Sequence, residues 1–167
     1  MIRTMNSCHM LIRDTGKGKS VFADKDFMSG EFICEFTGKI CTKEEYVRLH
    51  DPDNNHFLQI DDDRFMGPSN QADDLVNHSC NPNCGLEFAN GRIRLRAIRE
   101  IKKGDELTFD YSTTMDEDCW EMSCLCGDEN CRKVIRDFKH LPPELQAGYM
   151  ALGIVPPYIA KKINPSC

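Results

Sequence analysis

The sequence predicts a mainly β domain with a small helical content. Short runs of β-branched and aromatic residues recur along the chain, and Gly, Asn, Asp and Pro residues separate them. Helical periodicity is confined to a few short segments. The 167 residues, 40% of them hydrophobic, are enough for one domain with its own core, which therefore needs no disulfides for stability.

The N-terminal part of the chain predicts several short strands. Strands are expected over residues 8–13 and 20–23, joined by a flexible turn at 14–19. The Gly-x-Gly in this turn lacks the further glycines that nucleotide-binding loops need, so by itself it predicts only a hairpin turn. The strand pattern continues over residues 31–36 and 38–40.

A short helix and another strand are predicted next. The helix begins at Thr42, whose hydroxyl can form a capping box with Glu45 ahead of an apolar run. Residues 51–55 predict a turn and residues 56–60 a strand, before a Gly-Pro pair at 67–68 interrupts the chain.

Residues 86–88 and 92–98 predict the clearest hairpin, because an Asn-Gly turn separates two strand-like runs. Strict alternation in the second run predicts that Ile93, Leu95 and Ala97 face the core. The three arginines that alternate with them are expected to form a solvated face of the sheet.

The last strand is expected over residues 106–111, after a tight turn at 102–105. Cysteines cluster beyond it, up to residue 131. A helix is predicted over 132–138, and a Leu-Pro-Pro at 141–143 opens a second helix that ends near Gly153. These helices are expected to pack on the sheet or on a ligand.

The net charge of −6 argues against direct binding of nucleic acid and favours a basic protein or peptide as partner. The acidic runs at 61–63 and 116–118 could steer such a partner, although each is expected to be a solvated loop. No apolar segment reaches membrane-spanning length, and the first 13 residues lack a signal-peptide apolar region. We therefore expect an intracellular protein, cytoplasmic or nuclear, whose ten cysteines are reduced thiols available for metal binding.

The polar stretch at residues 77–84, Asn-His-Ser-Cys-Asn-Pro-Asn-Cys, is the most unusual part of the sequence. Nearly every side chain in it needs a hydrogen-bond partner, so it contributes little to a core. A metal site, a cysteine nucleophile beside a histidine, or a segment buried under a ligand would each explain it. A plain Ser/Asn/Pro turn is the alternative.

Cys124, Cys126 and Cys131 predict a structural zinc site, because three thiolates within eight residues can converge on one ion. A structural zinc takes four ligands, so a fourth must come from elsewhere. Cys119, Cys80 and Cys84 are candidates. Proximity in sequence favours Cys119, whereas Cys80 would fasten the tail over the central polar stretch.

Four features in this order resemble the SET-domain protein lysine methyltransferases with a zinc-binding post-SET segment. They are the Gly-x-Gly at 16–18, Glu-Phe-Thr-Gly at 35–38, the Asn-His-Ser-Cys-x-Pro-Asn stretch at 77–83 paired with Leu-Thr-Phe-Asp-Tyr at 107–111, and the Cys-x-Cys-x₄-Cys tail. The resemblance covers roughly residues 8–135. It implies a β-clip-like SET fold of short curved sheets. In this fold the polar stretch at 77–84 passes beside the strand that ends at residue 111 and forms a pseudoknot with it. The implied organisation is a SET domain at 8–112, a post-SET segment at 119–135 and a C-terminal helical tail at 136–167.

The resemblance also implies that S-adenosylmethionine is the cofactor. By analogy with the family, the backbone at Lys17, Gly18 and Lys19 borders the cofactor, Asn77 and His78 contact it, and Leu125 covers its adenine side. The family's zinc site takes its fourth ligand from the central stretch, so Cys80 joins Cys124, Cys126 and Cys131.

The resemblance makes Tyr111 the catalytic tyrosine of a lysine channel that also contains Phe109 and Phe36. The family has phenylalanine or tyrosine at the Phe109 position, and phenylalanine there implies di- or trimethylation. Phe36 departs from the usual tyrosine, which removes one hydroxyl from the channel. The implied substrate is a lysine in a basic protein, such as a histone tail.

Three other functions remain open at this point. A cysteine hydrolase would use Cys80 with His78, but residues two apart seldom face each other. A non-catalytic, zinc-stabilised module could bind lysine-rich peptides. A SET enzyme could also act on a non-histone target, such as a ribosomal protein.

Overall fold

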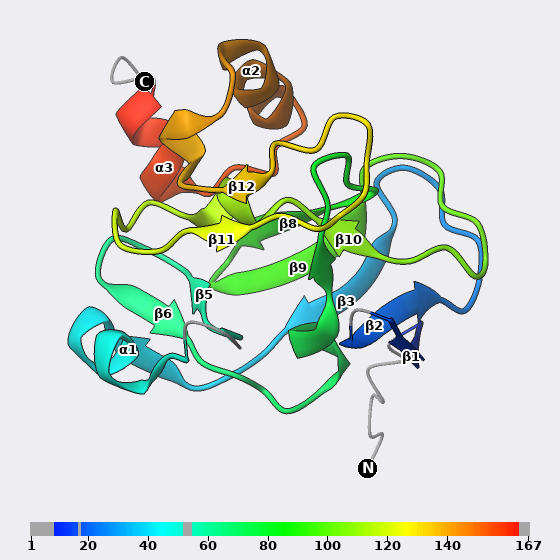
Figure 1. The fold of residues 1–167 in the computed structure, drawn as a ribbon, viewed down its shortest axis with the longest axis horizontal. Coiled ribbons are helices and arrows are strands. Elements are labelled where there is room, and N and C mark those ends of the chain that lie inside the picture. Colours follow the sequence, from blue (N-terminus) through cyan, green and yellow to red (C-terminus); the bar gives the residue numbers. More distant parts are fainter. Residues whose placement is uncertain (1–8, 17, 52–54, 164–167) are drawn as a thin grey trace.

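The computed structural model describes residues 9–16, 18–51 and 55–163. Small sheets form the body of the molecule and the α-helices lie at two of its edges, which agrees with the mainly β class that the sequence predicts (Figure 1). The strands are β1 (Met10–Thr15), β2 (Gly18–Ala23), β3 (Phe32–Phe36), β4 (Ile40–Thr42), β5 (Leu58–Gln59), β6 (Arg64–Met66), β7 (Asn77–His78), β8 (Cys84–Ala89), β9 (Arg92–Ala97), β10 (Thr108–Phe109), β11 (Met122–Ser123) and β12 (Val134–Ile135). The α-helices are α1 (Lys43–Leu49), α2 (Pro143–Ala151) and α3 (Pro157–Ile163), and the 3₁₀ turns are η1 (Ala72–Leu75), η2 (Tyr111–Thr114) and η3 (Phe138–His140).

Within the described residues, the strands form two three-stranded sheets and three two-stranded sheets. The central sheet has the order β3-β9-β8, and the second has the order β4-β6-β5. The predicted N-terminal hairpin is confirmed as β1-β2, while Cys8, where its first strand was expected to begin, lies outside the described residues. The strand predicted over 56–60 is confirmed only as the two-residue β5, because its partner β6 is itself short. Sequence analysis missed β6.

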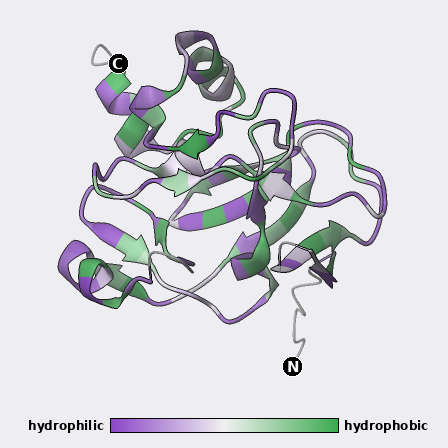
Figure 2. Cartoon of the chain, viewed as in Figure 1, coloured by the Kyte–Doolittle hydropathy of each residue, from purple (hydrophilic) through white to green (hydrophobic). Residues whose placement is uncertain are grey.

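The β8-β9 hairpin has the predicted turn and the predicted alternation. Asn90 and Gly91 both have positive φ, at 53° and 72°, as a tight two-residue hairpin turn requires. Ile93, Leu95 and Ala97 are buried on the inner face, and hydrophobic and hydrophilic residues alternate along β9 in Figure 2. The hairpin therefore supplies one wall of the core.

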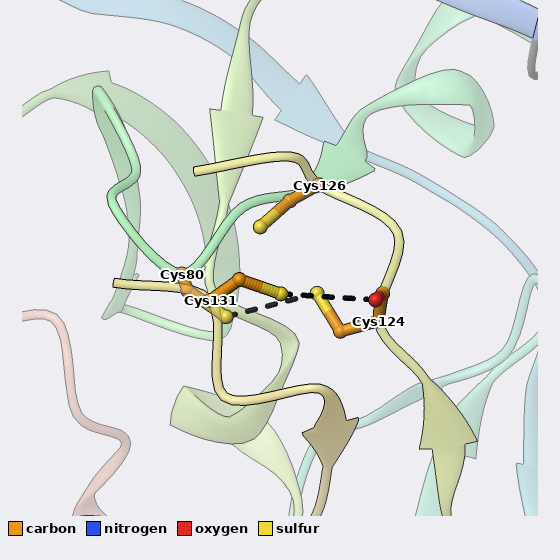
Figure 3. A group of neighbouring side chains, drawn as sticks. All are labelled: Cys80, Cys124, Cys126 and Cys131. Carbon is orange, nitrogen blue, oxygen red and sulfur yellow. Dashed lines mark hydrogen bonds between the residues drawn. The ribbon is translucent and has the colours of Figure 1, made fainter. Parts of the chain in front are cut away.

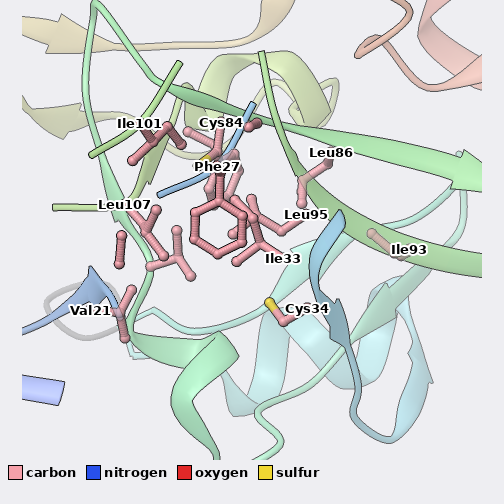
Figure 4. Packing of buried hydrophobic residues seen from close by; sticks show 14 of the residues in the cluster. Val21, Phe27, Ile33, Cys34, Cys84, Leu86, Ile93, Leu95, Ile101 and Leu107 are labelled. Carbon is pink, nitrogen blue, oxygen red and sulfur yellow. The ribbon is translucent and has the colours of Figure 1, made fainter. Parts of the chain in front are cut away.

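The main core lies between β2, the central sheet and the segment that leads to β10. Phe27 occupies its middle, surrounded by side chains from β3, β8 and β9 (Figure 4). Ile101 and Leu107 extend this core towards β10, so the same apolar cluster fixes the central sheet and the approach to Tyr111.

Helix α1 begins as predicted. The Thr42 hydroxyl accepts a hydrogen bond from the Glu45 backbone N–H, and the Glu45 carboxylate accepts one from the Thr42 N–H. Because the capping box is local, the sequence alone was enough to locate this helix start. Of the turn predicted before β5, residues 52–54 lie outside the described part of the chain.

The two remote motifs lie side by side. β7 pairs with β10 in parallel, with Asn77 opposite Thr108 and His78 opposite Phe109. This is the contact that the predicted crossing of the two segments requires. The strand predicted over 106–111 is confirmed only as the two-residue β10, with Glu106 in an isolated bridge to Phe22. At its C-terminal end the Asp110 side chain accepts a hydrogen bond from the Ser112 N–H and turns the chain into η2.

The helix predicted over 132–138 is wrong. Lys133 has φ of 65°, which a right-handed helix excludes, and Val134–Ile135 pairs with β11 as strand β12. Ile135 is buried among the cysteine side chains, so packing around these thiols determines the local conformation. The second predicted helix is confirmed as α2, and Gly153 follows it with φ of 67°.

Helix α3 was not predicted from the sequence, and with α2 it gives the tail two α-helices in the described residues. It begins at a proline, which suits the first turn of a helix because the missing N–H would have no partner there. None of the helices in the described residues is both long enough and apolar enough to span a membrane.

Candidate active site and metal centre

Asn77 joins three segments where β7 meets the rest of the chain. Its side-chain N–H₂ donates to the Ser20 hydroxyl at 2.7 Å, to the Lys19 carbonyl at 3.3 Å and to the Glu106 carboxylate at 3.2 Å. The structure thus brings one of the predicted cofactor-bordering positions, Lys19, into contact with Asn77, and Gly18 directly precedes it in β2. Lys17, the third, lies outside the described residues.

The space in front of Gly18 is open. Gly18 has φ of 102°, a conformation that favours glycine, and a Cβ added there would meet no atom within 4 Å. The main chain at the start of β2 is therefore accessible to a ligand lying beside Asn77. This is the kind of close backbone approach that binding an extended polar cofactor requires.

His78 is buried and both its ring nitrogens contact the protein. Its Nδ1 accepts a hydrogen bond from the Tyr111 N–H at 3.1 Å, which leaves the proton on Nε2, 3.3 Å from the Cys80 sulfur. Burial lowers the pKa of His78 to about 4 and outweighs the opposing effect of the Asp110 carboxylate, so the imidazole is neutral at physiological pH. His78 therefore couples Tyr111 to the cysteine cluster.

The side chains of Cys80 and His78 do face each other, so the expectation that residues two apart point away from each other is wrong here. A hydrolase is excluded on other grounds. Cys80 is buried, and burial raises its pKa, whereas a cysteine nucleophile needs an accessible thiolate. Its sulfur also lies 3.7 Å from that of Cys124, as part of a group of four thiols.

The sulfur atoms of Cys80, Cys124, Cys126 and Cys131 all lie within 4.8 Å of one another. Figure 3 shows Cys80, from the central loop, converging with the three tail cysteines. Tetrahedral zinc with Zn–S bonds of about 2.3 Å would set neighbouring sulfurs about 3.8 Å apart, so only small movements would be needed for them to bind zinc.

The donor chemistry also suits zinc. Burial raises the pKa of the Cys126 thiol, but hydrogen bonds from the backbone N–H groups of Cys80 and Asp128 outweigh this and lower it to about 7. Cys119, which proximity in sequence favoured, is exposed and does not belong to the group. Cys84 is buried in the central sheet, where burial raises its pKa to about 12.

Phe36, Phe109 and Tyr111 line one cavity of about 80 Å³. The Phe36 and Phe109 rings meet edge to face with centroids 5.9 Å apart, and those of Phe109 and Tyr111 are 4.9 Å apart. The Tyr111 hydroxyl donates to the Val76 carbonyl at 3.0 Å. Burial raises the Tyr111 pKa above its ordinary value, so the phenol stays neutral and acts as a hydrogen-bonding group rather than a base.

Tyr46, Glu117 and Trp120 line the same cavity, and sequence analysis missed them. The Tyr46 hydroxyl donates to Glu117 at 3.1 Å, which ties α1 to the segment after η2. The expectation of a solvated loop at 116–118 is wrong for Glu117, which is only 5% exposed. Its position in an acidic run hid this burial, and no sequence signal distinguishes it from its neighbours.

Leu125, between two of the clustered cysteines, is 75% exposed. Its assignment to the adenine side of the cofactor stays a prediction.

Comparison with known proteins identifies the family. A model of the SET domain matches residues 18–112, more than half of the chain. The chain belongs to the SET-domain family. The match covers β2 to the start of η2, so it includes the crossing of β7 with β10 and the three predicted channel residues Phe36, Phe109 and Tyr111.

The relatives carry methyltransferase names. A mouse protein named histone-lysine N-methyltransferase, H3 lysine-36 specific, is 31% identical over 153 residues, which cover 78% of this chain and 6% of that protein. The human protein of the same name is 33% identical over 136 residues, covering 72% and 5%. A Caenorhabditis briggsae protein named probable histone-lysine N-methyltransferase set-23 is 33% identical over 136 residues, covering 71% and 56%. This SET-domain chain thus spans a small part of the first two relatives and about half of the third.

Proposed function

We propose that this SET-domain chain transfers methyl groups from S-adenosylmethionine to a lysine side chain of a basic protein. One observation carries the proposal: Tyr111 belongs both to the crossing of β7 and β10 and to an aromatic cavity. Its backbone N–H donates a hydrogen bond to His78, and its ring lines the cavity together with Phe36 and Phe109. A cofactor lying along Lys17, Gly18, Lys19, Asn77 and His78 would meet a substrate side chain in that cavity.

S-adenosylmethionine, when bound, supplies an electrophilic methyl group on a positively charged sulfur. The chain must present the lysine amine in line with that methyl and without its proton. Deprotonating a lysine of pKa ~10.4 at neutral pH costs on the order of 4–5 kcal/mol. The aromatic walls of the cavity lower this cost, because they desolvate the ammonium group, and water can accept the proton.

Tyr111 is proposed to orient the amine through its neutral hydroxyl, which the Val76 carbonyl holds in place. Phe36 and Phe109 would confine the aliphatic part of the lysine. Because Phe109 has no hydroxyl to hold a water beside the amine, we propose that the product extends to di- or trimethyl-lysine.

We propose that zinc, bound by Cys80, Cys124, Cys126 and Cys131, has a structural role. Four thiolates complete its coordination and leave no open position for catalysis. The ion would fasten the post-SET segment, residues 119–135, over the SET domain at 8–112, with Leu125 at the adenine side of the cofactor. Residues 136–167 form the third proposed part of the chain, the C-terminal helical tail.

Histone H3 is the first substrate to test, since two relatives carry H3 lysine-36 specificity in their names. The negative net charge of the chain suits such a basic substrate. We propose an intracellular setting, nuclear or cytoplasmic, because a histone substrate would be found there. A non-catalytic peptide-binding module is not favoured, because it would have no need for a tyrosine-lined cavity beside a cofactor motif.

The proposal is tested by incubating the zinc-loaded protein with radiolabelled S-adenosylmethionine and with histones or a whole-cell lysate. We expect label in lysine residues of a basic protein, and at least a hundredfold less with Tyr111→Phe. Absence of transfer to any protein, or equal transfer by the two proteins, would contradict the proposed function.

A further inference from the structure

The C-terminal lobe, defined here as residues 138–163, has a core of its own. Phe138, Tyr149, Ile154 and Tyr158 are buried together in it. The lobe packs on the back of the central hairpin, where a Cβ added to Gly85 would lie 2.4 Å from Ile154. None of the sequence motifs extends into this lobe, and the family match ends at residue 112.

Tyr149 of α2 connects this lobe to the segment that carries Tyr111. Its hydroxyl donates to Asp110 Oδ2 at 3.0 Å, and the contact is buried. Asp110 is 1% exposed and directly precedes Tyr111. Within residues 9–16, 18–51 and 55–163, Tyr149 provides the only hydrogen bond to this oxygen.

Asp110 accepts two further hydrogen bonds and lies beside His78. Its Oδ1 accepts from Arg132, in the cysteine-rich segment, at 2.7 Å and from the Ser112 N–H of η2 at 3.1 Å. The His78 imidazole lies 3.5 Å from the same oxygen. Three segments that are remote from Asp110 in sequence, namely β7, the cysteine-rich segment and α2, therefore meet at one buried carboxylate.

The position of Asp110 determines the positions of its neighbours. Its side chain shapes the turn into η2, and the next residue, Tyr111, donates its N–H to His78. A rotation of Asp110 would therefore shift the Tyr111 ring in the cavity and the His78 ring beside Cys80. A buried carboxylate that lost its donor on one oxygen would have a strong tendency to rotate towards another donor.

We infer that Tyr149 is a positioning residue of the active site, which acts through Asp110 to fix Tyr111 and His78. On this basis the C-terminal lobe is part of the functional unit rather than an appendage. The inference deepens the proposed function, since it concerns how that site is held, but its geometric part does not depend on methyl transfer.

Tyr158 offers a matched control. It is also a buried tyrosine of the lobe, but its hydroxyl donates to the main-chain carbonyls of Gln59 and Thr114 and does not touch Asp110. Tyr149→Phe and Tyr158→Phe each remove one buried hydroxyl and keep the ring. A purely structural role would therefore give the two variants similar effects.

The first test uses NMR on the zinc-loaded protein to measure the hydrogen-exchange rate of the Tyr111 amide divided by that of the Leu95 amide in the core. The Leu95 amide reports global unfolding, so the ratio isolates local opening. We expect this ratio to rise at least tenfold with Tyr149→Phe and to stay within about twofold with Tyr158→Phe. An unchanged ratio with Tyr149→Phe would overturn the inference.

The second test measures methyl transfer at a temperature where both variants are folded. Tyr149→Phe is expected to lower kcat about tenfold with little change in the KM for the substrate, whereas Tyr158→Phe stays within about twofold. Equal kcat values for the two variants would overturn the inference. A wild-type protein without any transfer would instead defeat the proposed function, and the amide-exchange ratio would still decide the role of Tyr149.

A double-mutant cycle tests the route through Asp110. In the Asp110→Asn background, Tyr149→Phe is expected to change the exchange ratio by less than twofold, because the partner of the hydroxyl has already been altered. A tenfold change in that background would show that Tyr149 acts by another route. If Asp110→Asn does not fold, the comparison with Tyr158→Phe decides the inference.

Discussion

Phe109 presents a ring without a hydroxyl to the cavity beside Tyr111. Its centroid lies 4.9 Å from that of Tyr111, and on the proposed function an oxygen added to the ring would provide a hydrogen-bonding group near the substrate amine. Phe109→Tyr should therefore restrict the product to monomethyl-lysine, while the wild type reaches two or three methyl groups. Mass spectrometry of the same methylated peptide measures this, and a wild-type product that stops at one methyl would contradict the role of Phe109.

Glu117 is a second residue of this cavity, and its charge state controls stability. Burial raises its pKa above the ordinary value of 4.5, and the donor Tyr46 only partly offsets this. Below pH 4.5 the carboxyl is protonated in the folded and unfolded states alike. As the pH rises through the raised folded pKa, the folded state must ionise a buried group, and stability is lost.

We expect Glu117→Gln to raise the free energy of unfolding at pH 7.5 by on the order of 1 kcal/mol, and this gain should shrink towards zero near pH 4. Thermal unfolding at several pH values measures it. Glu121→Gln, at an exposed position in the same segment, is the control and should change stability by less than about 0.5 kcal/mol. A gain that grew as the pH fell would contradict the assigned burial.

At the residue scale, the place of the motif residues in the candidate site could be predicted from the sequence, but the burial of Glu117 in the cavity could not. Asn77, His78 and Tyr111 stand in a pattern that few other sequences contain, whereas Glu117 stands in an acidic run that is typical of solvated loops. Only the folding of α1 against the segment after η2 buries it. The Cys80–His78 contact was missed for a related reason, since β7 pairs at only two positions and the chain turns sharply after it.

Among the elements, those with local determinants were predictable. The capping box located α1, and the Asn-Gly turn located the β8-β9 hairpin, because the residues that decide them lie within a few positions of one another. The segment from 132 to 138 was not predictable in this way. Its conformation depends on thiols that include Cys80, about fifty residues away, so helix propensity gave the wrong answer.

The cysteine-rich segment gives a prediction of its own. Cys80→Ser should remove the fourth thiolate, abolish stoichiometric zinc binding and loosen the segment, whereas Cys119→Ser should leave zinc binding unchanged. Zinc content after dialysis against a weak chelator, together with proteolysis at the segment, measures both effects. Loss of zinc from Cys119→Ser with retention by Cys80→Ser would contradict the assigned ligand set.

At the scale of the whole molecule, the C-terminal lobe is held against the central sheet by close packing at Gly85. Gly85→Ala places a methyl group where Ile154 lies, and we expect it to destabilise the protein by about 2 kcal/mol. Gly148→Ala is the matched control, because a Cβ there meets nothing and alanine favours α2, so a gain of about 0.5–1 kcal/mol is expected. Chemical denaturation measures both, and equal stabilities would contradict the packing.

The sequence predicted the mainly β class and the crossing of two remote motifs, but not how the tail folds back. The crossing of β7 and β10 could be predicted from the motif residues, because their hydrogen-bonding groups need a shared partner. The tail has ordinary apolar residues, and only the three-dimensional fit of Ile154 against Gly85 and of Tyr149 against Asp110 shows where it belongs.

The central claim is that the chain at Gly18–Lys19, the β7 loop and the segment at Tyr111 together form one pocket for a sulfonium methyl donor. Isothermal titration of S-adenosylmethionine into the zinc-loaded protein tests it most directly. We expect one molecule bound per chain, with affinity reduced at least tenfold by Asn77→Ala. An absence of binding, or equal binding by Asn77→Ala, would contradict the claim.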